Sequence, residues 1–135
     1  MAAFVESDIL SEDLANKVLD LNSDTFKWYL TNTAPDTAAD AAIADLPTEL
    51  ANGNGYTTGG LTAVITYSRS GQTTTVSQTG NVVLTATGAV GPFRYLCLVD
   101  TTASRFLGHV DHGASVTMAN TDTYTIPSGS RFTIN

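Results

Sequence analysis

The sequence has a single cysteine, few lysines and no long apolar run. Cys97 has no partner in the chain, so a framework of intrachain disulfides is excluded. Its neighbours Tyr95, Leu96 and Leu98 predict a small buried side chain rather than a reactive thiol. No stretch approaches the roughly 20 apolar residues that span a bilayer, and the amino-terminal residues lack the basic and apolar regions of a signal peptide. We therefore expect no membrane partner and no Sec export.

Charge is distributed unevenly along the 135 residues, whose formal net charge is -7. Residues 1–49 hold ten Asp or Glu against two lysines, and residues 50–135 hold three aspartates against four arginines. Direct binding to nucleic acid depends on clustered Lys and Arg that neutralise phosphates, and no such patch is present. We expect no direct nucleic-acid binding. The length predicts one domain with a single core.

The amino-terminal part has the spacing of a helix. Apolar residues recur every three or four positions over residues 7–21, which predicts an amphipathic helix with Ser7 or Asp8 as its cap. Residues 1–6 before it are predicted to form an arm, so residues 1–22 make an arm and helix. Residues 36–45 predict a short helical turn, and the Gly- and Asn-rich residues 52–60 a flexible loop. The apolar positions of the helix are Ile9, Leu10, Leu14, Val18 and Leu21.

From residue 23 onward the pattern changes to that of strands. Short runs rich in Thr, Val and aromatic residues are separated by Gly, Asn, Pro or Ser at intervals of about ten residues. The chain holds 22 threonines, which suit the solvated face of a half-buried strand. The sequence predicts an all-β domain over residues 23–135, an antiparallel β-sandwich. The expected strands are 26–31, 61–68, 73–79, 81–87, 93–100, 105–110, 114–119, 122–126 and 131–134.

The strand at residues 93–100 differs from the others because both of its faces are apolar. Phe93, Cys97 and Val99 lie on one face, and Leu96 and Leu98 on the other. One face is expected to pack on the opposite sheet. The outer face, which we assign to Leu96 and Leu98, then needs cover from the amino-terminal helix, from residues 36–50 or from another subunit.

The two histidines form the strongest candidate for chemistry. In an extended strand His109 and Asp111 point to one face and His112 to the other, so the three converge only in a turn. No further Cys, His or Glu pattern nearby supplies the remaining ligands of a metal site. We interpret the histidines as surface or turn residues and predict no metal.

Other chemical motifs are missing. The glycines of residues 53–60 lead into a strand, whereas a phosphate-binding glycine loop follows a strand and opens a helix. The sequence has no nucleophile elbow, Walker sequence or zinc-binding motif, and its strand-rich half has only three carboxylates. The sequence therefore predicts no enzyme activity and no cofactor.

Three runs of residues together resemble a known family. Residues 23–35 (SDTFKWYLTNTAP), 53–57 (GNGYT) and 91–95 (GPFRY) are similar to small head proteins of tailed bacteriophages, and the similarity continues through Leu107, Gly108 and residues 115–126. It covers most of the chain from about residue 8. The resemblance implies a capsid cement or decoration protein with a jelly-roll-like β-sandwich, assembled as oligomers over capsomer junctions and without catalysis.

The expected function is therefore structural. The partners would be the major capsid protein and further copies of this chain, as a dimer or trimer, on the outer surface of a virion made in the bacterial host cytoplasm. The alternative is a tail-fibre or baseplate module that binds a receptor glycan through an exposed aromatic platform at Trp28 or Tyr56. A third function, a hydrolase, would need a cleft that joins Asp111, His109 and a nucleophile. The amino-terminal helix either reaches a neighbouring subunit or only covers the chain's own sheet. The predicted capsid or subunit contacts are Phe4, Val5, Ile9, Leu10, Leu96 and Leu98.

Overall fold

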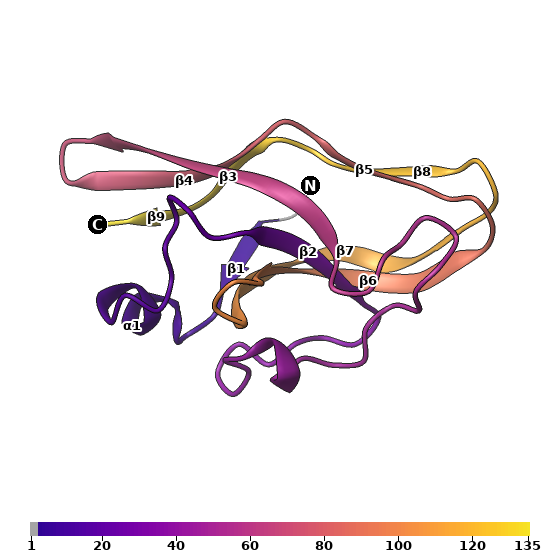
Figure 1. Ribbon diagram of the computed structural model, residues 1–135, viewed down its shortest axis with the longest axis horizontal. Coiled ribbons are helices and arrows are strands. Elements are labelled where there is room, and N and C mark those ends of the chain that lie inside the picture. Colours follow the sequence, from indigo (N-terminus) through magenta and orange to yellow (C-terminus); the bar gives the residue numbers. More distant parts are fainter. Residues whose placement is uncertain (1–2) are drawn as a thin grey trace.

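The computed structural model describes residues 3–135, and the fold is all-β, with 52% of the residues in strands and 7% in helices (Figure 1). The prediction of an all-β domain is confirmed. In chain order the elements are β1 (Phe4–Glu6), α1 (Leu10–Ala15), β2 (Phe26–Thr31), the 3-10 helix η1 (Ile43–Asp45), β3 (Leu61–Ser70), β4 (Thr73–Thr79), β5 (Val82–Thr85), β6 (Val90–Asp100), β7 (Arg105–Met118), β8 (Thr123–Ile126) and β9 (Gly129–Ile134).

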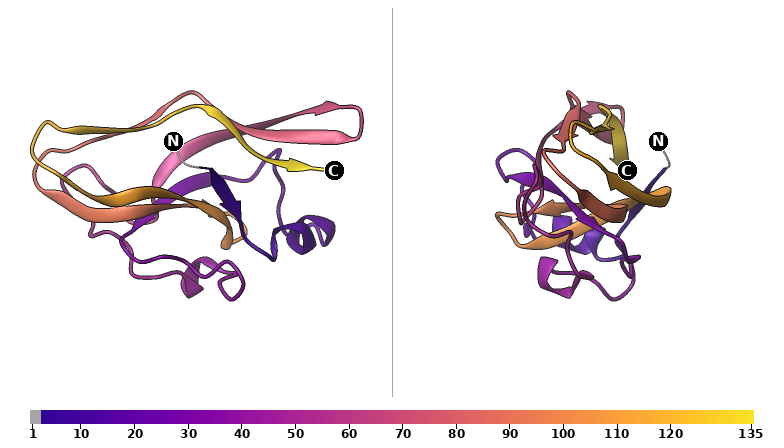
Figure 2. Two further views of the ribbon diagram at one scale, coloured as in Figure 1. Left: turned by 180° about the vertical axis from the view of Figure 1, so that it is seen from behind. Right: turned by 90° about the vertical axis from the view of Figure 1, so that its right-hand side faces the viewer.

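The carboxyl-terminal half is one long antiparallel hairpin that folds back on itself. β6 pairs with β7, β5 with β8, and β4 with β9, so residues 73–100 run alongside residues 105–134. The hairpin bends near residues 86–89 and 119–122. Its β6–β7 half then lies against the half that contains β4, β5, β8 and β9, so that the two halves form two layers (Figure 2). β2 and β3 connect the two halves of the folded hairpin, because β2 pairs with β6 and with β3, and β3 pairs with β4.

These pairings produce a seven-stranded antiparallel sheet in the order β1-β7-β6-β2-β3-β4-β9 and a two-stranded ribbon of β5 and β8. The sheet is nearly closed. Its two edge strands, β1 and β9, approach each other where the rings of Phe4 and Phe132 stack with centroids 5.8 Å apart. Residues 4–6 of the expected arm therefore form an edge strand of the sheet instead of extending from the domain, and residues 1–2 of that arm lie outside the described residues.

The core fills the interior of this curved sheet. Trp28 on β2 is completely buried there, with the Phe4 ring edge-on at 6.5 Å between centroids. Successive side chains point to opposite faces of each strand, but in β2 and in the second half of β6 both faces are buried. The largest fully buried side chains besides Trp28 are Tyr56, Phe93, Phe106, Leu30, Leu84, Leu96, Leu98, Leu107, Ile126, Val76 and Val99.

From Tyr95 onward the two faces of β6 are the reverse of the expected ones, whereas Phe93, which precedes a register shift between Phe93 and Tyr95, lies in the main core as expected. Leu96 and Leu98 are fully buried in the main core, so the prediction that they form an outer face is wrong. Cys97 and Val99 on the opposite face belong to a second small cluster, which Leu46 and the partly buried Ile43 cover. Because both faces of β6 are apolar, the sequence pattern does not indicate which face points into the main core. Residues 36–50, one of the covers that we considered, provide the outer layer.

The amino-terminal helix is shorter than predicted. The spacing predicted residues 7–21, whereas α1 spans Leu10–Ala15. The expected cap is also wrong, because no side-chain hydrogen bond caps α1, and the hydroxyl of Ser7 donates to the carbonyl of Asp40 instead. The helix ends before Lys17, whose φ of 59° is left-handed, and the chain then turns Leu19 into the core. Burial of Leu19 takes precedence over continuing the helical stripe.

The strands are otherwise close to the predicted ones. The segments 105–110 and 114–119, predicted as two strands, are the single long strand β7, which passes through Gly113 at a φ of 99°. The predicted helical turn at 36–45 is limited to η1.

Candidate interaction surface

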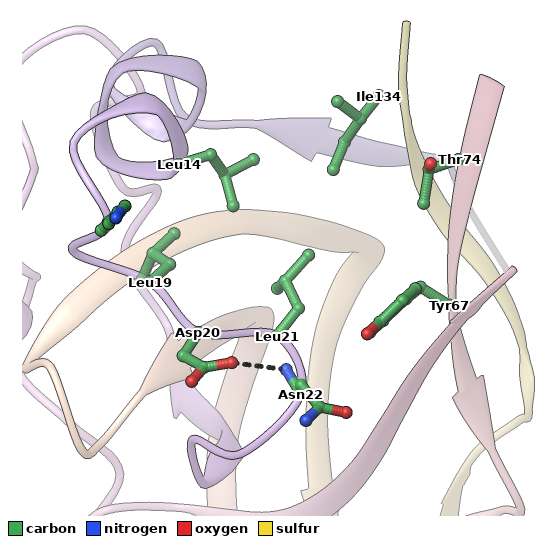
Figure 3. Close-up of a pocket in the computed structure, with 9 residues that line it drawn as sticks. Leu14, Leu19, Asp20, Leu21, Asn22, Tyr67, Thr74 and Ile134 are labelled. Atoms are coloured by element: carbon green, nitrogen blue, oxygen red, sulfur yellow. Dashed lines mark hydrogen bonds between the residues drawn. The ribbon is translucent and has the colours of Figure 1, made fainter. Parts of the chain in front are cut away.

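One end of the molecule carries a hollow lined mainly by apolar side chains, which we call the α1 groove. It has a volume of about 430 Å³ and lies between α1 with the segment that follows it and the projecting ends of β3, β4 and β9 (Figure 3). Leu14, Leu19 and Leu21 line one wall, and Tyr67 and Ile134 line the other.

A second hollow of about 480 Å³ continues the α1 groove along β9. It shares Leu14 and Ile134 with the first and adds Leu10, Phe132 and Glu6. β9 is the last strand of the sheet and pairs only with β4. The free edge of β9 therefore borders a continuous apolar surface. Exposed strand edges of this kind are common sites of pairing with another chain.

Charged groups lie at the rim of the α1 groove. Lys17 and Asp20 line it, and Asp20 is exposed to solvent. The hydroxyl of Ser23 and the backbone N–H of Asn22 donate to the Asp20 carboxylate at 2.6 and 2.9 Å, and these bonds lower its pKa. The rim is thus polar and the floor apolar, an arrangement that protein interaction sites share.

Large apolar side chains are exposed at this end. Tyr67 of β3 is 50% exposed and Val18, just after α1, is 38% exposed. Val5 of β1 is 45% exposed, whereas Phe4 beside it points inward. A sheet residue and its neighbour face opposite sides, so β1 presents only Val5 to solvent.

The six predicted contact residues are therefore divided. Val5 is exposed, and Phe4 and Ile9 are partly buried. Leu10, Leu96 and Leu98 are at most 3% exposed and belong to the chain's own core. The prediction that these three leucines form a contact surface is wrong, because the chain itself already surrounds their side chains. Leu10 and Leu14 of α1 instead pack on the chain's own core, as in the alternative in which the helix only covers its own sheet.

The sequence did not indicate Tyr67, Ile134 or Val18 as surface residues. Tyr67 and Ile134 continue the inward-facing pattern of β3 and β9, which normally means core. They are accessible because the β3–β4 hairpin and the end of β9 project past the closed part of the sheet (Figure 1). The accessibility of Tyr67 and Ile134 follows from how far the β3–β4 hairpin extends beyond the rest of the sheet, which the sequence alone does not show.

The two histidines do not form a joint site. Asp111 accepts two hydrogen bonds from Arg94, at 2.8 and 3.0 Å, and this ion pair lowers the pKa of Asp111 to about 2. His112 pairs with the hydroxyl of Tyr124 at 2.8 Å. His109 packs edge-on against Tyr95, and its burial lowers its pKa. Each group has its own neighbour, and no nucleophile joins them.

The aromatic platform expected for glycan binding is absent from the surface. Trp28 is completely buried and Tyr56 is 1% exposed, so the prediction that either is exposed is wrong. The Tyr56 hydroxyl accepts from the backbone N–H of Leu30 and donates to the Glu49 carboxylate. Burial and the Glu49 hydrogen bond raise the pKa of Tyr56 well above its usual value. Tyr56 thus anchors the glycine-rich loop that we expected to be flexible.

Within residues 3–135, no group of three His, Cys, Asp or Glu side chains is arranged to hold a metal ion. Over the same residues, no helix has the length and apolar character needed to cross a membrane. Comparison of the chain with protein-family models, with curated proteins and with solved structures finds no match. Inferences about function therefore rest on the surface of this chain and on its sequence.

Proposed function

We propose that this chain is a structural protein of a tailed-bacteriophage head that binds the outer surface of the capsid and cements or decorates the lattice of the major capsid protein. The observation that carries the proposal is the α1 groove, an open apolar surface beside a free strand edge. Such a surface suits attachment to another protein. The resemblance of residues 23–35, 53–57 and 91–95 to small phage head proteins identifies the class of partner.

The finer architecture belongs to the same proposal. A jelly-roll-like sandwich is supported by the folded hairpin of residues 73–100 and 105–134, whose two halves enclose the core. The pairing of β2 with β6 and of β1 with β7 adds strands beyond that hairpin. Assembly as a dimer or trimer would repeat the groove over neighbouring capsomers, so that a modest contact gains strength from multivalency.

A structural role without catalysis is part of the proposal. A hydrolase built on Asp111 and His109 is not favoured, because Asp111 pairs with Arg94 and the His109 ring packs against Tyr95. A receptor-binding role on the tail was the alternative, but its aromatic platform at Trp28 and Tyr56 lies in the core. No observed surface favours that alternative.

Binding to capsids tests the proposal. The protein should co-sediment with heads assembled from the major capsid protein encoded with it, and it should appear as density on the outside of the shell by cryo-electron microscopy. The variant Tyr67→Asp should lose this binding, because Tyr67 lines the α1 groove and is 50% exposed, so that the substitution places a charge in the apolar groove. Val83→Asp is the matched control, since Val83 is 52% exposed and does not line the groove.

Circular dichroism should show that both variants keep the fold, since the side chains of Tyr67 and Val83 are both exposed. Failure of the unaltered protein to bind assembled heads, or density on the tail instead of the head, would contradict the proposal. Equal binding by the groove variant and the Val83 variant would remove the α1 groove from the mechanism.

A further inference from the structure

Arg131 is a partly buried arginine whose charge has no acidic partner. Residues 3–135 contain two ion pairs, Arg94–Asp111 and Arg105–Asp13, and neither involves Arg131. The other arginine without an acidic partner is Arg69, which is exposed on the β3–β4 hairpin. A charge in a partly buried position normally requires an opposite charge or a full set of hydrogen bonds.

A β-bulge directs the side chain of Arg131 toward the interior. In the pairing of β4 with β9, Val76 faces Phe132 and Ser77 faces Ser130, so Arg131 is the extra residue. A bulge of this kind redirects a side chain that would otherwise face outward. The guanidinium accordingly lies over the Trp28 ring, 5.5 Å from its centroid.

Only part of the guanidinium is satisfied by the protein. Nη2 donates to Gln78 Oε1 at 3.1 Å and to the carbonyl of Pro127. Nη1 has a single long contact of 3.4 Å to the Ser130 carbonyl, and Nε has no partner. Neutral carbonyl oxygens thus hold one nitrogen, whereas the positive charge itself remains uncompensated.

A cavity of about 380 Å³ lies beside this guanidinium. It opens between the edge strands β1 and β9, with Phe4 and Val110 on its apolar side and residues 127–131 on its polar side. Its lining includes the hydroxyl-bearing Ser128 and Ser130, and among the described residues that line it Arg131 alone is charged. Burial lowers the pKa of Arg131, which agrees with a guanidinium that lacks a counter-charge.

We propose that this cavity, which we call the Arg131 pocket, binds a carboxylate. The ligand oxygen would accept from Nη1 of Arg131 and from the serine hydroxyls at the mouth, and its short aliphatic part would lie against Phe4 and Val110. Carboxylates are the natural partners of a guanidinium because charge-assisted hydrogen bonds are shorter and stronger than neutral ones. A free small carboxylate and an Asp or Glu side chain of a partner protein share this chemistry. The inference does not depend on the function proposed above.

Trp28 supplies a direct measurement, because it is the only tryptophan in the chain and lies beneath the Arg131 guanidinium. Sodium acetate, titrated at constant ionic strength with chloride, should produce a saturable change in tryptophan fluorescence. The capped tripeptide Ala-Glu-Ala tests the side-chain source, with capped Ala-Gln-Ala as its neutral control. Tighter binding of the glutamate peptide than of acetate assigns the pocket to a partner's acidic side chain, and the reverse order assigns it to a free carboxylate.

Arg131→Gln should weaken acetate binding by roughly tenfold or more, since it removes the charge that assists the hydrogen bond. Arg131→Lys retains the charge and keeps the test valid if the glutamine variant folds poorly, and it should retain weaker, saturable binding. Arg69→Gln is the matched control and should bind as the unaltered protein does. The proposal is overturned if acetate and the glutamate peptide both leave the fluorescence of the unaltered protein no different from chloride. Tighter binding of inorganic phosphate than of either carboxylate would overturn the assignment of the ligand.

Discussion

Asp13 of α1 and Arg105 of β7, 92 residues apart in the sequence, form a bidentate ion pair. Nε and Nη2 of Arg105 donate to the two carboxylate oxygens of Asp13 at 2.8 and 3.0 Å. The Asp13 side chain is only 5% exposed and that of Arg105 25%. The pair raises the pKa of Arg105. It joins the short helix to the long hairpin and thereby positions Leu14, on the same helix, at the α1 groove.

Replacing Asp13 with Asn should therefore destabilise the fold. The variant leaves Arg105 without its counter-charge in a mostly buried position, and we expect a loss of about 2 to 4 kcal/mol in the free energy of unfolding. Arg94→Gln is the control, because the Arg94–Asp111 pair has side chains 37% and 38% exposed and should contribute much less to stability than the Asp13–Arg105 pair. Urea denaturation measures both. Equal losses for the two variants would mean that the Asp13–Arg105 pair does not anchor the helix.

Asp100 gives the protein a pH dependence of defined sign. Asp100 is fully buried, and this burial together with the neighbouring carboxyl of Asp24 raises its pKa to about 7 from an ordinary value of 3.8. The folded state therefore binds a proton that the unfolded state releases near pH 4. This contribution to stability is complete below about pH 4 and is lost as the pH rises through about 7.

We expect the free energy of unfolding to fall between pH 5 and 7 by at most about 1 kcal/mol per pH unit, after allowance for solvent screening around Asp24. Asp100→Asn mimics the protonated form, because an amide oxygen still accepts from the backbone N–H groups of Thr102 and Ala103. Denaturation series at several pH values should show that this variant has a flatter dependence. Asp111→Asn is the control, because the pKa of Asp111 is lowered to about 2 and its contribution is lost only in stronger acid. An unchanged slope in Asp100→Asn would exclude Asp100 as its source.

The strands could be predicted from the sequence because their evidence is local. Alternating side chains and turn residues identify β4 as Thr73–Thr79, and β2 as Phe26–Thr31, with the predicted bounds. The direction of β6 could not be predicted in the same way, because both of its faces are apolar and periodicity therefore carries no information. The decision depends on Ile43 and Leu46, about 50 residues away, which cover the Cys97 face.

The α1 groove could not be predicted from the sequence either, because it depends on how distant segments of the chain are arranged in space. Tyr67 and Ile134 have the same alternation as core residues, and only their place beyond the closed part of the sheet exposes them. Conversely, the sequence pattern predicts a contact surface at Leu96 and Leu98. The structure buries both side chains in the same core as Trp28 and Phe93, and this packing cannot be read from the sequence. A local pattern gives the apolar character of a side chain, but not whether the chain itself covers it.

Cys97 should be unreactive in the folded protein. It is fully buried under Leu46 and Ile43, and burial raises the pKa of its thiol far above the usual value. Because the thiolate is the reactive form, iodoacetamide at pH 8 should label the native protein only at the rate at which the fold opens. Mass spectrometry should detect full labelling in urea. Rapid labelling of the native protein would show that residues 36–50 do not form a stable cover.

Two glycines of the anchored loop offer a matched comparison. Gly53 and Gly55 both have positive φ angles, of 123° and 105°, so alanine at either position carries a similar backbone cost of about 1 to 2 kcal/mol. A Cβ at Gly53 meets no atom within 4 Å, whereas one at Gly55 would overlap the carbonyl oxygen of Thr85. Gly55→Ala should therefore cost roughly 1 to 3 kcal/mol more than Gly53→Ala in urea denaturation. The difference reports how closely the loop that carries Tyr56 packs on the end of β5, and equal losses would show that this loop moves freely away from the sheet.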